Sequence, residues 1–298
     1  MKRSDLLKQS ATLGLLVAGT PLAAQAAPAK REVAVAPLNP PHGGVPVAFL
    51  LSEGAVVIDF TGPWEVFQDA DVTGRTSPAF NLYTVSETGK PITTSGGMTV
   101  TPRYSFDNVP APKVVVVPAQ SDPTAAVKQW LVSTAKSADL VMSVCTGAFV
   151  LAQAGLLDGM TVTTHHSGFT TMGMHYPNVT VARGVRFTDN GRVATSAGLS
   201  AGIDLALHVV ARYYGKEAAR QTAYDMEYLS THWLDADNAT YGKPPRVARA
   251  GDAICPVCWM EVDPKKSAEV TYRGTQYYFC MPEHAKLFSS APARFLSA

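Results

Sequence analysis

Short apolar runs alternate with stretches of helical periodicity between residues 45 and 232. The runs Val47–Leu51 and Lys113–Val117 are too short for helices and too uniformly apolar for half-exposed strands, so we interpret them as buried parallel strands. After the second run, Asp122 is suited to cap a helix that extends to about Lys136. Strands that alternate with helices predict an α/β domain with a mainly parallel sheet.

The remaining elements of this domain follow the same alternation. Asp189-Asn190-Gly191 is a strong hairpin signal, and the pair Gly96-Gly97 marks a turn inside a strand-forming region. The predicted strands are Phe80–Val85, Thr93–Val100, Met160–Thr164, Val179–Phe187 and Arg192–Thr195, and the predicted closing helices are Gly198–Tyr214 and Lys216–His232.

One cysteine occupies the junction between a strand and a helix. Leu140–Val144 has the pattern of a buried strand, Cys145 follows it, and helical spacing then continues to Gly155. A thiol at the carboxyl end of a central strand and at the positive end of a helix dipole is expected to have a lowered pKa. Cys145 is therefore a candidate nucleophile, and the alternative is a buried inert thiol.

The second catalytic candidate is Asp59. The segment Val56–Phe60 leads toward Pro63, which suits the first position of a helix. We therefore expect Asp59 on a loop at the same edge of the sheet as Cys145. A carboxylate there is able to act as the acid/base partner of the thiol, and the alternative is a helix cap.

Five further residues are candidates for the wall of this site. Backbone N–H groups around Ala119, Gln120 and Thr146 are expected to stabilise negative charge on a substrate. His165 follows a predicted strand and is a possible partner for the cysteine, although a histidine at the end of a core strand is more often structural. Trp64 is expected to line either the pocket or the core.

The N-terminal residues predict an export signal, and the composition along the chain predicts how it divides into domains and linkers. The basic residues near the start, the modestly apolar stretch 11–24 and the sequence Ala24-Gln25-Ala26 match a secretory signal rather than a buried helix, and Lys2-Arg3 resembles a twin-arginine signal with lysine in first place. No uninterrupted apolar run has the length of a transmembrane helix. We predict a periplasmic protein without a membrane anchor after signal removal, organised as signal peptide 1–26, linker 27–44, main domain 45–232, linker 233–251 and C-terminal unit 252–298.

Four metal-ligating side chains are concentrated in the C-terminal unit. Cys255 and Cys258 form a Cys-x-x-Cys pair, and Cys280 and His284 follow after about twenty residues. A unit of this size builds little core and usually requires a metal, disulfides or a partner surface. The four side chains fit a closed tetrahedral zinc site, and thiolates also suit copper(I); a disulfide or free thiols are the alternative.

Composition narrows the range of partners. The 298-residue chain has 25 Lys plus Arg against 24 Asp plus Glu, so its formal net charge is +1. This balance gives no electrostatic argument for a nucleic-acid or anionic-membrane partner. The hydrophobic fraction of 46% supports a sizeable core. The expectation of a small-molecule substrate comes instead from the candidate site at the carboxyl edge of the sheet, where open α/β sheets bind ligands.

The main domain resembles the ThiJ/PfpI superfamily, which has a class I glutamine amidotransferase-like fold, and within it the isonitrile hydratase branch. The likeness is carried by Ile58–Phe67, Val144–Gly159, Thr163–His165 and Ser196–Leu207. It implies a flavodoxin-like, doubly wound parallel sheet with a cysteine nucleophile elbow, no cofactor and a homodimer. In that branch the nucleophile aligns with Cys145 and the essential carboxylate with Asp59, and Thr146 lies beside them.

The resemblance implies hydration of an isocyanide to an N-substituted formamide through a thioimidate on the cysteine. Peptidase-like members have histidine directly after the cysteine, where this chain has Thr146, which argues against peptidase activity. The family's Pro-Gly-Gly is Pro118-Ala119-Gln120 here, which implies a reshaped oxyanion pocket.

The C-terminal unit resembles the YHS domain, a small metal-binding module. The likeness is carried by Cys255–Pro264, Tyr272–Gly274, Tyr277–Cys280 and Phe288–Leu296. Family members usually have cysteine where His284 stands and glycine where Trp259 stands; the first difference retains a metal ligand. The resemblance implies bound zinc or copper.

Two other functions are consistent with these features. In the first, a periplasmic redox or metal-stress protein, Cys145 is an oxidant-sensitive thiol and the C-terminal unit binds copper or zinc. In the second, the chain is a transcription regulator, because similar main domains occur fused to DNA-binding helices. No helix-turn-helix pattern is recognised and an export signal is predicted, so we expect no nucleic-acid partner.

Overall fold

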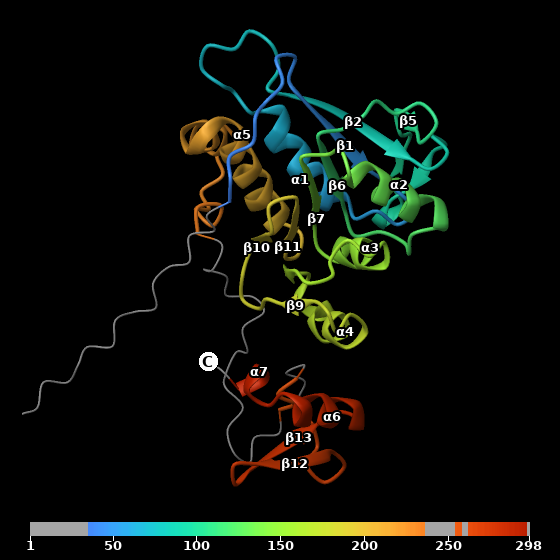
Figure 1. The fold of residues 1–298 in the computed structure, drawn as a ribbon, viewed down its shortest axis with the longest axis vertical. Coiled ribbons are helices and arrows are strands. Elements are labelled where there is room, and N and C mark those ends of the chain that lie inside the picture. The colour runs from blue at the N-terminus through green and yellow to red at the C-terminus, as the bar shows by residue number, and fades with distance from the viewer. Residues whose placement is uncertain (1–34, 236–253, 258–261, 297–298) are drawn as a thin grey trace, which may run out of the picture. The chain divides into compact units, whose positions relative to one another are not determined.

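The computed structural model describes residues 35–235, 254–257 and 262–296 (Figure 1). The predicted signal peptide, the first part of the first linker, most of the second linker and Cys258 lie outside the described residues. The elements of the larger part are β1 (Val45–Leu50), α1 (Val57–Gln68), β2 (Phe80–Ser86), β3 (Ile92–Thr93), η1 (Ser95–Gly97), β4 (Thr99–Val100), β5 (Tyr104–Ser105), β6 (Val114–Val117), α2 (Ala125–Ala135), β7 (Leu140–Ser143), α3 (Gly147–Gln153), β8 (Thr161–Val162), η2 (His166–Gly168), α4 (Phe169–His175), β9 (Thr180–Val181), β10 (Phe187–Asp189), β11 (Val193–Ser196) and α5 (Ala201–Asp225).

A seven-stranded sheet forms the centre of this part, in the order β10-β11-β7-β6-β1-β2-β5. All neighbouring strands in it are parallel except β10, which pairs with β11 in the antiparallel sense. β6 and β7 lie side by side at the centre, so their carboxyl ends open onto the same edge of the sheet. That edge is where open α/β sheets bind ligands. The predicted fold class, flavodoxin-like α/β, is confirmed.

Both faces of the sheet are buried, as the uniformly apolar strands predict. In β6, Val114 and Val116 belong to one core cluster and Val115 and Val117 to the other. Side chains of α1 and α5 complete the first cluster, and side chains of α2 and α3 complete the second. Figure 1 shows these two pairs of helices on opposite sides of the sheet. A valine at each of these positions buries apolar area on either face.

Three helix boundaries differ from the predictions. α1 begins at Val57, so Asp59 lies in its first turn and Pro63 lies inside the helix. α2 is capped by Thr124, whose hydroxyl accepts from Val127 N, because the Asp122 carboxylate instead accepts from Gln153.

The two predicted closing helices are one helix, α5, interrupted at Gly215. The backbone of that residue has a φ of 88°, which favours glycine. The element ends at Asp225, before the predicted end at His232.

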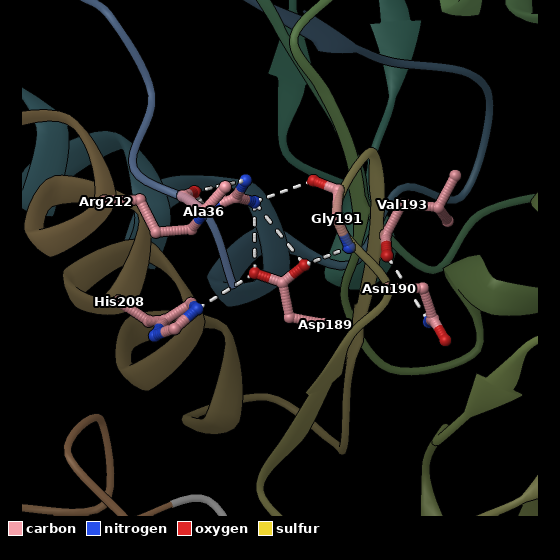
Figure 2. A network of polar contacts seen from close by, with 7 residues as sticks. All are labelled: Ala36, Asp189, Asn190, Gly191, Val193, His208 and Arg212. Atoms are coloured by element: carbon pink, nitrogen blue, oxygen red, sulfur yellow. Dashed lines mark hydrogen bonds and ion pairs between the residues drawn. The ribbon is translucent and has the colours of Figure 1, made fainter. Parts of the chain in front are cut away.

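The predicted hairpin around Asp189-Asn190-Gly191 is confirmed as β10 and β11, although Val179–Phe187 is not one strand. Figure 2 shows how the hairpin is attached to α5. The buried Asp189 carboxylate accepts from His208 at 2.9 Å and from Arg212 at 3.1 Å. Arg212 also donates to Ala36 O at 3.2 Å, so it links the hairpin, α5 and the segment before β1.

The C-terminal unit has its own small core. It consists of a hairpin, a helix and a short final turn: β12 (Ala268–Tyr272), β13 (Thr275–Phe279), α6 (Pro282–Ser290) and α7 (Ala293–Leu296). Cys255, Val257, Phe279 and Phe288 are fully buried within it. Among the described residues of this unit, only these four form the buried apolar cluster, and the expected need for a metal or another stabilising link stays a prediction.

Among the described residues, no helix combines the length and the apolar character that crossing a membrane requires.

Candidate active site

Cys145 lies on a sharp turn between β7 and α3. Its φ of 59° is left-handed, a conformation that L residues rarely adopt. Three hydrogen bonds fix the turn: Cys145 N donates to Ala197 O at 3.0 Å, Thr164 Oγ1 donates to Cys145 O at 2.8 Å, and Gly147 N donates to Val144 O at 2.9 Å. The expected sharp turn between strand and helix is therefore present at Cys145, held in a strained conformation by its surroundings.

The residue that allows this turn to pack is Gly147. A Cβ atom added to Gly147 would lie 2.2 Å from Val117 O and 2.8 Å from Pro118 O. Only a residue without a side chain lets the first turn of α3 approach the end of β6 so closely. This close approach places the cysteine beside the Pro118–Gln120 segment that follows β6.

Asp59 faces the elbow from the first turn of α1. The residue is fully buried, and its Oδ2 accepts from Ala119 N at 3.1 Å. Among the described residues, Oδ1 has no nitrogen or oxygen donor. Burial raises the pKa of the carboxyl from 3.8 to about 6, against the opposing effects of the Ala119 amide and the Cys145 thiol. This carboxyl is therefore able to hold or release a proton close to neutral pH.

The expectation of a lowered thiol pKa is wrong for the resting site. Burial and the negative charge of Asp59 raise the pKa of Cys145 from 9.0 to about 11. Three donors oppose that rise: the amide of Thr146, the amide of Leu199 and the hydroxyl of Thr146. The thiol is only 6% exposed and shares its site with a carboxylate, so desolvation and like charge outweigh these donors and the dipole of the seven-residue helix α3.

The predicted wall residues have different positions. The Ala119 amide is already bonded to Asp59, so it positions the carboxyl instead of facing a substrate. Gln120 Oε1 accepts from Ser52 N at 2.7 Å and fixes the loop after β1, whereas its Nε2 is buried without a partner among the described residues. Thr146 donates to the Cys145 sulfur from both its amide and its hydroxyl.

The two aromatic candidates lie at the margin of the site or against the core. The half-buried Trp64 ring packs on the core residue Phe49 with ring centroids 4.9 Å apart. His165 Nδ1 accepts from Ser167 N at 3.3 Å, and its ring lies against Gly198, where an added Cβ would come within 2.4 Å. Burial and the neighbouring His166 lower the pKa of His165. His165 thus lies beside the loop that contacts the cysteine.

Sequence reasoning missed Leu199 as a contributor to the site. Its amide donates to the Cys145 sulfur, and its own φ is 49°. The available signal was the run of small residues Ser196–Gly202, which has too little bulk to be a core strand or a regular helix start. An amide contact of this kind depends on backbone geometry and leaves no residue-type signature.

A second cluster of reactive side chains lies in the C-terminal unit. His284 Nδ1 is 3.1 Å from Cys280 Sγ and 3.5 Å from Cys255 Sγ, and the three ligand atoms all lie within 4.8 Å of one another. Cys255 and His284 are buried. Thiolate and imidazole are ligands that zinc and copper accept in this arrangement. The fourth predicted ligand, Cys258, lies outside the described residues.

Comparison with known proteins identifies the larger domain. Residues 45–212 match the DJ-1/PfpI family. The chain belongs to the DJ-1/PfpI family. A DJ-1/PfpI relative, the isonitrile hydratase of Pseudomonas putida, is 32% identical over 198 residues, which cover 64% of this chain and 81% of that protein. The crystal structure of a ThiJ/PfpI family protein from Pseudomonas syringae is similar to this chain over 63% of this chain and 76% of that protein, with 25% identity and a TM-score of 0.55.

Other DJ-1/PfpI relatives carry different names. The transcriptional regulator GbdR of Pseudomonas aeruginosa, described as HTH-type, is 31% identical over 189 residues, but the match spans only 51% of its length. Drosophila melanogaster DJ-1beta shares the fold at 19% identity, with a TM-score of 0.54. The family thus includes proteins named as enzymes and proteins named as regulators. Our expectations of no nucleic-acid partner, a homodimer, export and a YHS domain stay predictions.

Proposed function

We propose that the chain is a cysteine-dependent enzyme of the isonitrile hydratase type, which hydrates an isocyanide or a similar small electrophile. The observation that carries the proposal is the pairing of the Cys145 thiol with the buried Asp59 carboxyl. The relationship to the Pseudomonas putida isonitrile hydratase supports it. Thr146 in place of histidine after the cysteine supports a reaction other than peptide hydrolysis.

The pKa values of the pair define the first step. Asp59, with a pKa of about 6, is mainly ionised at neutral pH, whereas the thiol, with a pKa of about 11, is protonated. Complete proton transfer in the resting site is unfavourable, so Asp59 takes the proton as sulfur attacks the terminal carbon of the isocyanide. A carbon–sulfur bond forms, and Asp59 returns the proton to that carbon. The product is a thioimidate on Cys145.

The second step uses the same carboxylate. Asp59 accepts a proton from water as the water oxygen bonds to the thioimidate carbon, and Asp59 gives that proton to the nitrogen. The carbon–sulfur bond then breaks as Asp59 takes the proton of the new hydroxyl and gives it to sulfur, and an N-substituted formamide leaves. The net reaction adds one water to one isocyanide. The Thr146 and Leu199 amides stabilise the sulfur while it carries negative charge in both steps.

Incubation of the purified protein with an aryl isocyanide is expected to yield the formamide, measured by liquid chromatography. Cys145→Ala is expected to reduce the rate to the uncatalysed background, because no other group in the site is able to form the thioimidate. Val132→Ala, at an exposed position on α2, is the control and should retain turnover. Absence of turnover, or equal turnover in Cys145→Ala, would refute the proposal.

The second candidate function is a redox or metal-stress protein, and the cluster of Cys255, Cys280 and His284 favours it. In this proposal the cluster, completed by Cys258, holds zinc or copper, and Cys145 is the oxidant-sensitive thiol. The predicted export to the periplasm would place both groups in an oxidising compartment.

The purified chain is expected to contain about one equivalent of zinc or copper by mass-spectrometric metal analysis. Cys280→Ser is expected to lower this metal content to about a tenth, because the serine hydroxyl binds zinc or copper much more weakly than a cysteine thiolate does. Cys145→Ser is the matched control and should retain the metal. Equal content in wild type and Cys280→Ser would exclude these residues as ligands.

A further inference from the structure

The loop Ala197–Ser200, which joins β11 to α5, holds Cys145 from one side. Cys145 N donates to Ala197 O at 3.0 Å, and the Leu199 amide donates to the Cys145 sulfur. Leu199 is in a left-handed conformation with a φ of 49°. A backbone donor in such a conformation needs support, because the backbone strain favours a different loop geometry.

Arg186, immediately before β10, supplies that support. Its carbonyl accepts from Ala197 N at 2.9 Å. Its Nη2 donates to Ser200 Oγ at 3.1 Å, and its Nε donates to Asp204 Oδ2 at 2.6 Å. One residue therefore binds both ends of the loop and the first turn of α5.

The partner of Arg186 is itself fixed. Asp204 is fully buried, and its Oδ1 accepts from Tyr228 Oη at 3.1 Å and from Ser230 Oγ at 3.2 Å. The ion pair is largely removed from water, since the Arg186 side chain is only 11% exposed. A buried pair in which both carboxylate oxygens and two guanidinium nitrogens form hydrogen bonds has few alternative geometries. These bonds fix the loop Ala197–Ser200 in one position, in which the Leu199 amide lies within hydrogen-bonding distance of the Cys145 sulfur.

We propose that Arg186 is a positioning residue for Cys145, acting through Ser200 and Asp204 to hold the Leu199 amide against the sulfur. The inference rests on the proposed role of Cys145 as nucleophile and adds a device that sets its reactivity. Arg186 acts through the loop, without touching the thiol. The charged group that shifts the pKa of the Cys145 thiol is Asp59 on α1, and the Arg186 guanidinium is not among the causes of that shift.

Replacement by lysine separates position from charge. Arg186→Lys retains the positive charge but cannot bond Asp204 and Ser200 together with the planar geometry of a guanidinium. We expect the rate of Cys145 alkylation by iodoacetamide to fall about tenfold at each pH from about 7 to about 9, as one hydrogen bond to the thiolate is lost. Mass spectrometry of the digested protein measures the alkylation of Cys145 separately from that of the other cysteines.

The matched control is Arg212→Lys. Arg212 lies on α5, also pairs with a buried aspartate, Asp189, and supports Ala36 instead of the cysteine loop (Figure 2). Arg212→Lys should lower the free energy of unfolding in urea about as much as Arg186→Lys does. It should leave the pH profile of Cys145 alkylation unchanged. An unchanged profile in Arg186→Lys, or an equal change in both variants, overturns the proposal.

A milder variant keeps the test valid if Arg186→Lys does not fold. Ser200→Ala removes only the Nη2 contact at an exposed position, and we expect a fall in alkylation rate of about threefold in the same direction. An unchanged rate in Ser200→Ala, where Arg186→Lys is unfolded, also overturns the proposal. Alkylation needs no substrate, so these outcomes are independent of whether the chain hydrates isocyanides.

Discussion

Replacement of Asp59 by asparagine is expected to lower the rate of isocyanide hydration by about 10³-fold, within the range measured for loss of a general acid/base. Asparagine keeps the size of the side chain and an oxygen for the Ala119 amide, but it cannot accept the thiol proton or activate water. The measurement is kcat with an aryl isocyanide, compared with wild type at pH 8.

The pH profile gives an independent check on Asp59. The wild-type rate should decline as pH falls through about 6, because the protonated carboxyl cannot act as a base. This acidic limb should be absent from the residual activity of Asp59→Asn. A limb that persists in the variant would assign the titration to another group.

The same substitution should not weaken the fold. The folded-state pKa of Asp59 lies above 3.8, so ionisation destabilises the folded state: the penalty is absent below about pH 4 and complete above the folded pKa. At pH 8, Asp59→Asn should therefore raise the free energy of unfolding by about 1 to 3 kcal/mol. Loss of activity accompanied by a lower free energy of unfolding would contradict this assignment.

Replacement of Gly147 by alanine is expected to lower the free energy of unfolding by about 3 kcal/mol. The new methyl group would overlap Val117 O at 2.2 Å and Pro118 O at 2.8 Å. Both are backbone atoms at the carboxyl end of the central strand β6, so the first turn of α3 must move and carry the turn at Cys145 with it. Urea unfolding monitored by circular dichroism measures the change, and activity should fall in parallel.

Gly43→Ala is the control for this effect. An added Cβ at Gly43 meets no atom within 4 Å, and the residue has no positive φ. We expect its free energy of unfolding to stay within about 0.5 kcal/mol of wild type. Equal destabilisation by the two substitutions would show that the close approach of α3 to β6 is not the cause.

Much of the fold could be predicted because it depends on local patterns. Uniformly apolar runs such as Val114–Val117 need burial on both faces, and only a sheet covered by two helix layers provides it. The helix boundary near Asp59 could not be predicted in the same way. Pro63 indicated a later start, but α1 begins at Val57 and continues through the proline, and Gly62 beside it packs against Ile203 of α5.

The residue types of the site were accessible from sequence, whereas its electrostatics were not. Cys145 and Asp59 follow from position at one sheet edge. The pKa of the thiol depends on how completely water is excluded and on the distance to a carboxylate, which only the folded arrangement determines. The contact between the Leu199 amide and the sulfur could not be predicted from the sequence, because every residue except proline has a backbone amide and only the fold determines which one faces Cys145.

The left-handed backbone at Cys145 has a consequence for how this protein can evolve. Glycine has no Cβ and adopts a φ of 59° without a steric clash. Any other residue at this position lowers the stability of the fold by about 1 kcal/mol relative to glycine. A lineage that lost the need for the thiol would gain stability by drifting to glycine. Continued occupation of the position by a larger residue in a descendant would thus record selection for chemistry.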